Sequence, residues 1–177
     1  MKPRNVMSSL DMDRSLDRIS LEIIERNHGV EQVAIIGIHT GGVILAQRMR
    51  DKLWESEGVD VPLGHLDITL YRDDWSLISQ NPVVRKTDIA FSLEDRHVVL
   101  VDDVIFTGRT IRAAMDAVMD YGRPRSMQLA VLVDRGGREL PIQPDYQGMV
   151  VRAGQGERVD VVLASDSAED RVVVAPR

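Results

Sequence analysis

Four largely apolar runs recur along the chain, and a polar turn follows each of them. Their lengths and their β-branched residues are typical of strands that are buried on both faces, as in parallel sheets. The predicted strands are Gln32–Ile38, Val61–Tyr71, Val98–Val101 and Ser126–Val133. Shorter β-rich pieces follow at Val150–Val151, Val159–Leu163 and Arg171–Val174.

Helical periodicity separates the predicted strands. Apolar residues at helical spacing follow Ser8 and predict an amphipathic helix that ends near His28. Further helices are predicted after Gly42 to about Glu57, and from Ile111 to Tyr121. This alternation predicts an α/β fold, with a mainly parallel central sheet flanked by helices, in a single domain that spans the chain.

Four polar loops follow the four predicted strands. They are Thr40–Gly42, Arg72–Leu93, Val104–Thr110 and Asp134–Glu139. Because the carboxyl ends of parallel strands meet at one edge of a sheet, we expect these loops to form a single polyanion-binding mouth. The loop Arg72–Leu93 is long for a compact domain, and it is either a lid over the site or a simple solvated excursion.

The stretch Val98–Thr110 carries the most direct chemical signal. A buried strand leads to two acids, Asp102 and Asp103, and a short turn then opens a helix. The amino terminus of a helix offers N–H groups and a positive dipole to a phosphate, while the acids suit sugar hydroxyls or a metal that touches them. The acid pair taken alone has a structural alternative, in which it ends a strand and the turn caps a helix.

Composition narrows the class of protein. The 177 residues are 44% hydrophobic and 28% charged, and the net charge of −6 argues against an indiscriminate nucleic-acid binder, although a local basic patch can exist. Cysteine is absent, which excludes disulfides, thiol nucleophiles and thiolate metal sites. No apolar run approaches the ~20 residues of a membrane span, and the stretch Met1–Asp13 lacks the apolar core of a signal peptide. We therefore expect a cytoplasmic protein that does not bind membranes.

The stretch Val98–Thr110 resembles, at every position, the 5-phosphoribosyl-1-pyrophosphate (PRPP) motif of type I phosphoribosyltransferases. Competing nucleotide motifs, the P-loop and the Gly-x-Gly-x-x-Gly fingerprint, do not occur in the chain. Other runs resemble the PyrR family, whose members are pyrimidine-operon regulators of this fold with uracil phosphoribosyltransferase activity. These runs are Ile24–Asn27, Asp67–Asp74, Met115–Ala117, Gly122–Pro124, Gln128–Gly136 and Arg138–Ile142.

The resemblance implies a type I phosphoribosyltransferase fold with a small hood and a long flexible loop. The implied reaction joins uracil to PRPP and gives UMP and pyrophosphate, with Mg²⁺ held through the ligand and no firm protein ligand. Asp102 and Asp103 would form the catalytic pair that holds the ribose hydroxyls. The 5′-phosphate would be bound by Val104, Ile105, Phe106, Thr107, Gly108, Arg109 and Thr110. Thr40 and Gly41 would bind pyrophosphate, the flexible loop would contribute Arg72 and Arg85, and the uracil hood would contain Asp134, Arg135 and Gly136.

The chain departs from the family pattern at two places. Relatives commonly carry Lys-Thr-Arg-Gly where residues 39–42 of this chain read His-Thr-Gly-Gly, so Gly41 replaces a guanidinium that could pair with pyrophosphate. Many PyrR proteins also bind the leader of pyrimidine-biosynthesis mRNA in a uridine-nucleotide-dependent way. Arg18, Arg26 and Arg138 match basic positions of that RNA face. Asp17, Leu21 and Gln143 stand where a hydroxyl, a histidine and a basic residue are usual.

Both family roles are therefore expected, with two alternatives. In the first alternative only one role is retained, and the protein is either an enzyme without RNA binding or a nucleotide-sensing regulator with little catalysis. In the second, the protein transfers phosphoribose to another base. The expected partners are PRPP, uracil, UMP or UTP and pyr mRNA leader RNA, and a homo-oligomer, a dimer or higher, is expected. If RNA binding is retained, Arg18, Arg26 and Arg138 should share one surface apart from the mouth.

Overall fold

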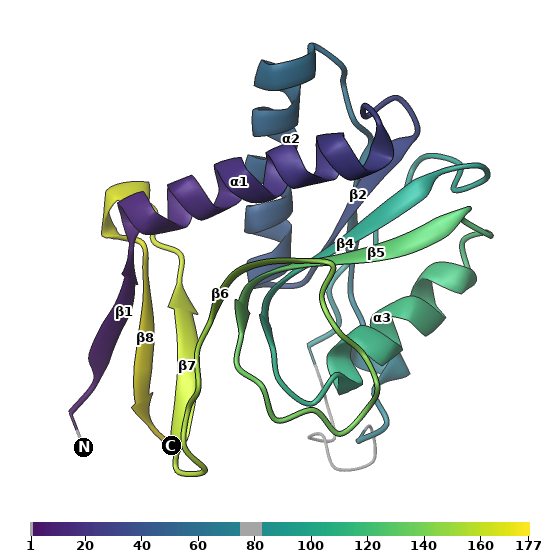
Figure 1. Cartoon of the computed structure of the whole chain (residues 1–177). Coiled ribbons are helices and arrows are strands. Elements are labelled where there is room, and N and C mark those ends of the chain that lie inside the picture. The colour runs from purple at the N-terminus through teal and green to yellow at the C-terminus, as the bar shows by residue number, and fades with distance from the viewer. Residues whose placement is uncertain (1, 75–82) are drawn as a thin grey trace.

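Five strands form a wholly parallel sheet in the order β3-β2-β4-β5-β6 (Figure 1). The computed structural model describes residues 2–74 and 83–177. The strands are β2 (Val33–Ile38), β3 (Leu63–Leu66), β4 (His97–Ile105), β5 (Ser126–Asp134) and β6 (Tyr146–Val150). The predicted parallel α/β architecture is confirmed.

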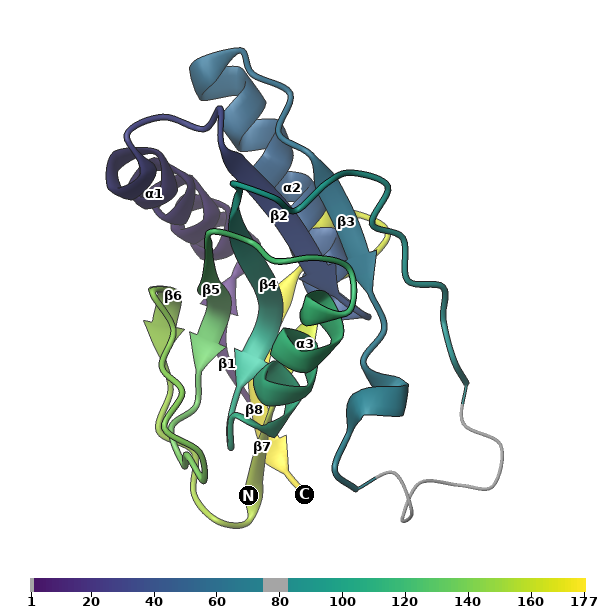
Figure 2. The same ribbon diagram turned by 90° about the vertical axis from the view of Figure 1, so that its right-hand side faces the viewer.

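Helices cover both faces of this sheet. Figure 2 shows α1 (Ser9–Asn27) and α2 (Gly41–Glu57) on one face and α3 (Arg109–Met119) on the other. Alternate residues of β2 serve the two faces: Ile35 packs in the core under α1 and α2, whereas Ile36 packs in the core under α3. Because both faces are covered, β2 is buried along its whole length, which explains its continuous apolar sequence.

A second, three-stranded antiparallel sheet joins segments from opposite ends of the chain, in the order β1-β8-β7. Its strands are β1 (Arg4–Ser8), β7 (Glu157–Val162) and β8 (Arg171–Pro176), and Figure 1 shows it beside the amino-terminal end of α1. Buried Val172 and Val174 of β8 belong to the same hydrophobic cluster as Met12 and Leu16 of α1. The sequence did not predict β1, and its β-rich carboxyl-terminal pieces were not assigned to a separate sheet.

The predicted strand Val61–Tyr71 is wrong in length, because β3 ends at Leu66. The carboxylate of Asp67 accepts hydrogen bonds from the backbone N–H and the hydroxyl of Thr69, at 2.8 and 2.5 Å. These local bonds replace strand pairing and start a 3₁₀ helix, Thr69–Tyr71.

The central strand is longer than its apolar run. β4 continues past Val101 to Ile105, because Asp102 and Val104 still pair with residues of β5. Both acids therefore belong to the end of a paired strand rather than to the turn that follows it.

The predicted flexible loop Arg72–Leu93 includes residues 75–82, which are outside the described residues. The described part after this gap is held close to β3. Asp67 donates its N–H to the Thr87 hydroxyl at 3.1 Å, and the N–H of Arg85 donates to the Asp67 carboxylate. His65 and Asp88 exchange two backbone hydrogen bonds of 2.8 Å. The returning end of the loop is thus fixed beside β3.

Candidate functional site

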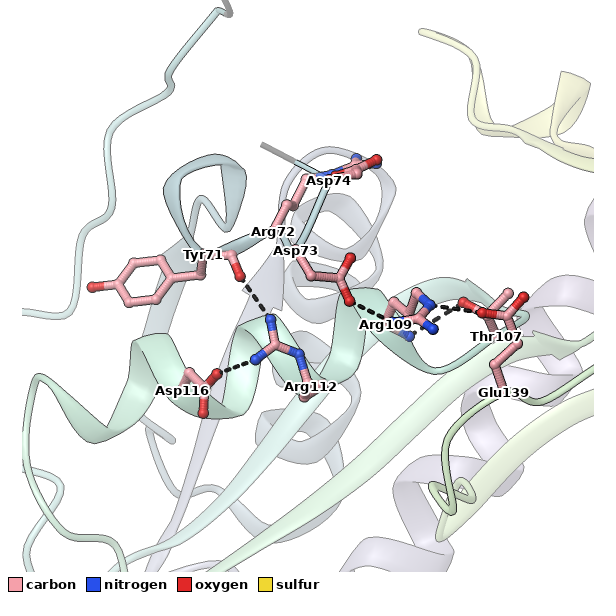
Figure 3. A network of polar contacts seen from close by, with 9 residues as sticks. All are labelled: Tyr71, Arg72, Asp73, Asp74, Thr107, Arg109, Arg112, Asp116 and Glu139. Atoms are coloured by element: carbon pink, nitrogen blue, oxygen red, sulfur yellow. Dashed lines mark hydrogen bonds and ion pairs between the residues drawn. The ribbon is translucent and has the colours of Figure 1, made fainter. Parts of the chain in front are cut away.

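Arg109, the first residue of α3, joins three of the four loops that were expected to form the mouth. Its Nη1 lies 2.5 Å from Asp73 in the loop after β3, and its Nε lies 2.7 Å from Glu139 in the loop after β5 (Figure 3). A cavity of about 330 Å³ opens here, and it is lined by Arg72, Asp73, Asp74, Thr107, Arg109 and Thr110. The loops therefore converge as predicted, and both positive and negative groups line the cavity.

A second set of contacts fastens the segment after β3 to α3. Arg112 donates from Nη2 to the carbonyl of Tyr71 at 2.9 Å and pairs with Asp116 at 2.6 Å (Figure 3). The hydroxyl of Tyr71 also donates to Asp120 near the end of the helix. Sequence reasoning missed these partners and also Asp73 and Glu139, because an exposed charge does not reveal from sequence which opposite charge it meets.

The residues from Val104 to Thr110 are called the phosphate loop below. The loop turns into α3 at Gly108, whose φ of 92° favours glycine. No side chain caps the helix there, and in the described part of the chain the N–H groups of Thr107 and Gly108 donate to no protein atom. Free N–H groups and the positive end of a helix dipole together form an anion site.

Carbonyl groups of the same loop already accept hydrogen bonds. The donors belong to residues 135–145, which are called the post-β5 segment below. Arg135 donates its N–H to Ile105 O at 3.0 Å, and Glu139 donates its N–H to Thr107 O at 2.9 Å. With its acceptors satisfied in this way, the loop keeps the amide donors of Thr107 and Gly108 for a ligand.

Asp102 and Asp103 lie beside this loop; Asp102 is buried, only 7% exposed, and Asp103 is partly buried. Burial raises the pKa of Asp102 well above its usual value, and the neighbouring Asp103 raises it further; burial also raises the pKa of Asp103. The Asp103 N–H donates to Asp102 at 2.9 Å and the Val104 N–H to Asp103 at 2.7 Å. No arginine or lysine of the described residues pairs with either acid, so the pair lacks the partners that would stabilise two negative charges.

Asp134, at the end of β5, has the opposite electrostatic setting. Burial alone would raise its pKa, but a 2.7 Å bond from Arg138 and the N–H of Gly136 hold the pKa below its usual value. Asp134 is therefore an ionised acid with a fixed cation, whereas the Asp102–Asp103 pair favours holding a proton.

The loop after β2 lies against the acid pair. The peptide bond between His39 and Thr40 is cis. The backbone of Gly41 approaches Asp103 so closely that a Cβ at residue 41 would overlap the carboxylate, and a Cβ on Gly42 would overlap the carbonyl of Val101. The glycine pair is thus required by close packing against β4, and the Asp103 carboxylate occupies the space where a side chain at residue 41 would begin.

The arginines predicted for RNA binding separate into two groups. Arg18 and Arg26 are on α1 and face β6: Arg18 donates to Gly148 O at 2.8 Å, and Arg26 pairs with Asp145 at 2.6 Å. Arg138 does not offer a free surface guanidinium, because it is largely buried and donates to Asp134, to Phe106 O and to Ile142 O. Because Phe106 belongs to the phosphate loop, the expectation that all three arginines share one surface apart from the mouth is wrong for Arg138.

Comparison with known proteins identifies the family. Residues 8–161 match the family described as "Phosphoribosyl transferase domain". The chain is 55% identical over 167 residues to the "Bifunctional protein PyrR" of Deinococcus radiodurans, which covers 94% of this chain and 91% of that protein. It is 49% identical over 175 residues to the protein of the same name from Enterococcus faecalis, which covers 99% of this chain and 98% of the other. The chain belongs to the PyrR family.

Solved structures support the fold of this PyrR-family chain. The hypoxanthine phosphoribosyltransferase of Trypanosoma cruzi has a TM-score of 0.72 at 18% identity, with coverage of 98% of this chain and 97% of that one. A hypoxanthine phosphoribosyltransferase from Staphylococcus aureus has a TM-score of 0.65 at 14% identity, with coverage of 85% and 79%. At these identities the likeness concerns the fold alone.

We predict that Asp102→Asn stabilises the protein at neutral and alkaline pH. The folded-state pKa of Asp102 is raised above its unfolded value, so the parent loses stability as the pH rises through the folded pKa. An amide cannot ionise and escapes this loss. Thermal denaturation should show a higher melting temperature for the variant at pH 8 and a much smaller difference at pH 4. The exposed acid variant Asp116→Asn is the control, and an equal gain for Asp102→Asn at both pH values would contradict the burial argument.

Proposed function

We propose that this PyrR-family protein transfers the phosphoribosyl group of PRPP to uracil, releasing UMP and pyrophosphate. The observation that carries the proposal is the Asp102–Asp103 pair, of which Asp102 is buried, directly beside a loop whose free amides form an anion site. A ligand that fits both features has a phosphate on one side and neighbouring hydroxyls on the other. The ribose 5-phosphate half of PRPP is such a ligand.

In this proposal the two acids hold the ribose hydroxyls, and the phosphate loop holds the 5′-phosphate through its amides and the hydroxyls of Thr107 and Thr110. Thr40 and Gly41 receive pyrophosphate through the backbone. Bond breaking at the anomeric carbon builds positive charge on the ribose, which ionised acids nearby stabilise electrostatically. No general base for uracil is evident among the described side chains, so catalysis rests on positioning and electrostatics.

The remaining predicted residues complete the site. Arg72 and Arg85 belong to the flexible loop that would exclude water from the donor, and Asp134, Arg135 and Gly136 belong to the segment expected to cover uracil. Arg72 forms two hydrogen bonds to Asp74, at 2.8 and 2.7 Å. On binding, pyrophosphate would replace Asp74 as the partner of this guanidinium.

Mg²⁺ fits the donors that are present. The described residues contain no cluster of three or more acids and histidines that could hold a metal alone. Two adjacent carboxylates that pair with no arginine or lysine of the described residues suit an ion that keeps waters and takes oxygens from its ligand. Bound in this way, the ion would neutralise charge on pyrophosphate and favour the ionised form of the acids, with Asp102 and Asp103 as the residues nearest to it.

The second proposed role is uridine-nucleotide-dependent binding to pyr mRNA leader RNA, with UMP or UTP as the effector. Arg18 and Arg26 provide two guanidiniums on one face of α1, next to exposed Leu21. This face would be enlarged in a homo-oligomer. A cytoplasmic location suits both roles, and none of the helices in the described ranges is long and apolar enough to cross a membrane.

Replacing both acids, Asp102→Asn with Asp103→Asn, should abolish UMP formation and leave the fold intact, because amides cannot stabilise the developing ribose cation as carboxylates do. Synthesis of UMP from uracil and PRPP gives the rate, and circular dichroism checks the fold. Asp116→Asn serves as the matched control. Turnover of the double variant at the parent rate would remove these acids from the mechanism.

The loop after β2 can be tested with a pair of variants. Gly41→Ala introduces only the Cβ that displaces Asp103, and should weaken binding of pyrophosphate with Mg²⁺. Gly41→Arg introduces the same Cβ together with a guanidinium, and a charge-assisted contact worth roughly 1.5–3 kcal/mol should make it bind at least tenfold more tightly than Gly41→Ala. Titration calorimetry measures both affinities. Equal affinities of the two folded variants would mean that the loop acts through its backbone alone.

RNA binding should depend on the α1 face and not on the mouth. Changing Arg18 and Arg26 to Ala together should weaken binding to the organism's own pyr leader RNA and flatten its dependence on salt, because phosphate contacts are lost. UMP synthesis should not change. A mobility-shift titration with and without UMP makes the measurement, with exposed Arg171→Ala on the second sheet as control. If the parent does not bind this RNA specifically at moderate salt, the regulatory role is absent and the enzyme alone remains.

A further inference from the structure

Arg135 is a buried cation. The residue is 9% exposed, and no carboxylate of the described residues forms an ion pair with it. Its guanidinium carbon instead lies 3.9 Å from the centre of the Phe106 ring, and its Nη2 donates to the carbonyl of Glu157 at 2.7 Å. Burying a cation without an ion pair costs free energy, and the contacts with the ring and the carbonyl offset part of that cost.

The ring that Arg135 covers belongs to the phosphate loop. Phe106 follows the last residue of β4, and its carbonyl accepts a 3.0 Å bond from Arg138. The backbone of Gly137, at a φ of 76°, passes so close that a Cβ there would lie 2.5 Å from the ring. The Phe106 ring is thus held by the post-β5 segment, which also satisfies the loop's carbonyls.

The same guanidinium reaches the second sheet. Glu157, whose carbonyl accepts from Arg135, is the first residue of β7. Arg135 therefore connects a loop at the end of the parallel sheet to a strand of the antiparallel sheet. Removing it would take away the cation nearest to the Phe106 ring, since Arg177 lies 5.7 Å from the ring centre, and would leave the Glu157 carbonyl without this donor.

Two contacts orient the guanidinium of Arg135. Nη2 donates to the carbonyl of Glu157, one face of the guanidinium covers the Phe106 ring, and Nε is enclosed by protein without a partner among the described residues. The ring and the Glu157 carbonyl therefore set the position of the guanidinium. This geometry favours a structural role toward the phosphate loop over the direct uracil contact expected from the hood segment.

We propose that Arg135 is a positioning residue that acts through Phe106: it fixes the ring between the post-β5 segment and β7, and so holds the phosphate loop in the shape that binds the 5′-phosphate. The inference rests on the proposed function in one respect, namely that this loop receives the phosphate of the donor. It adds that affinity for the phosphate depends on a stacked cation that touches no substrate atom.

A double-mutant cycle tests the coupling, with ribose 5-phosphate as the probe and calorimetry as the measurement. Arg135→Met keeps the length of the side chain and removes its charge, and Phe106→Leu keeps an apolar group and removes the ring. Each change should weaken binding about fivefold, as expected for loss of a desolvated cation–π contact. The double variant should bind no more weakly than the weaker single variant, because both changes remove one interaction.

Phe106→Tyr provides the conservative background. It keeps the ring, so Arg135→Met should cost the same factor in this background as in the parent, whereas in the Phe106→Leu background it should cost nothing. Steady-state kinetics should show a higher KM for PRPP in Arg135→Met and little change in the KM for uracil. Melting temperatures and circular dichroism identify any variant that fails to fold, and Arg135→Gln, which also lacks the charge, then replaces Arg135→Met.

The outcomes separate this inference from the proposed function. Independent factors that multiply in the double variant would overturn positioning through Phe106, and so would a raised KM for uracil with unchanged binding of ribose 5-phosphate, which would assign Arg135 to the base. Either result leaves the transferase proposal standing if the parent makes UMP. A parent that neither makes UMP nor binds ribose 5-phosphate would overturn both.

Discussion

Two adjacent carboxylates at the buried end of a central strand determine the electrostatics of the mouth. β4 lies between β2 and β5, so Asp102 and Asp103 are enclosed by paired strands and by the glycines that begin α2. Neither acid meets a cation of the described chain. Their burial therefore favours the protonated form, and a ligand that supplies hydroxyls or a cation supplies what the protein omits. The negative charges of the two acids are thus balanced only when a ligand or a cation is bound.

The other charges of the mouth are already paired with one another. Arg109 is held by Asp73 and Glu139, and Asp134 is held by Arg138. The phosphate of the proposed donor would compete with Asp73 and Glu139 for the exposed Arg109, which has partners in the meantime. By contrast, Arg138 is bonded to Asp134 and to the Phe106 carbonyl. It therefore supports the shape of the phosphate loop and does not offer an unpaired charge to a ligand.

Hydrophobic patterning predicted most of the parallel sheet and all three long helices, because strands buried on both faces and amphipathic helices leave strong signals. It failed where local polar bonds decide the structure. The Asp67 carboxylate ends β3 early by bonding to Thr69, and nothing in the apolar run Val61–Tyr71 marks that point. β1 was missed because a short edge strand with two charged or amide residues depends on its distant partner, β8.

The candidate site was predictable to the level of its loops, because parallel topology brings the carboxyl ends of the strands together. Individual roles were less accessible. Arg138 was predicted from resemblance to lie on an RNA-binding face, yet its contacts to Phe106 O and Asp134 are internal. The burial of Arg135 against an aromatic ring likewise depends on the path of a loop. Sequence spacing does not specify such a path, since it is set by tertiary packing around glycines such as Gly137.

The pairing of β1 with β8 has a consequence for how the protein is made. Arg4 pairs with Val174, so the first strand remains without a partner until nearly all of the described chain has been synthesised. The parallel sheet, whose last strand ends at Val150, can assemble earlier. The contact from Arg135 to Glu157 crosses between these two stages. The loop that we assign to the phosphate would then reach its final shape among the last parts of the protein to fold, after long-range pairing has formed.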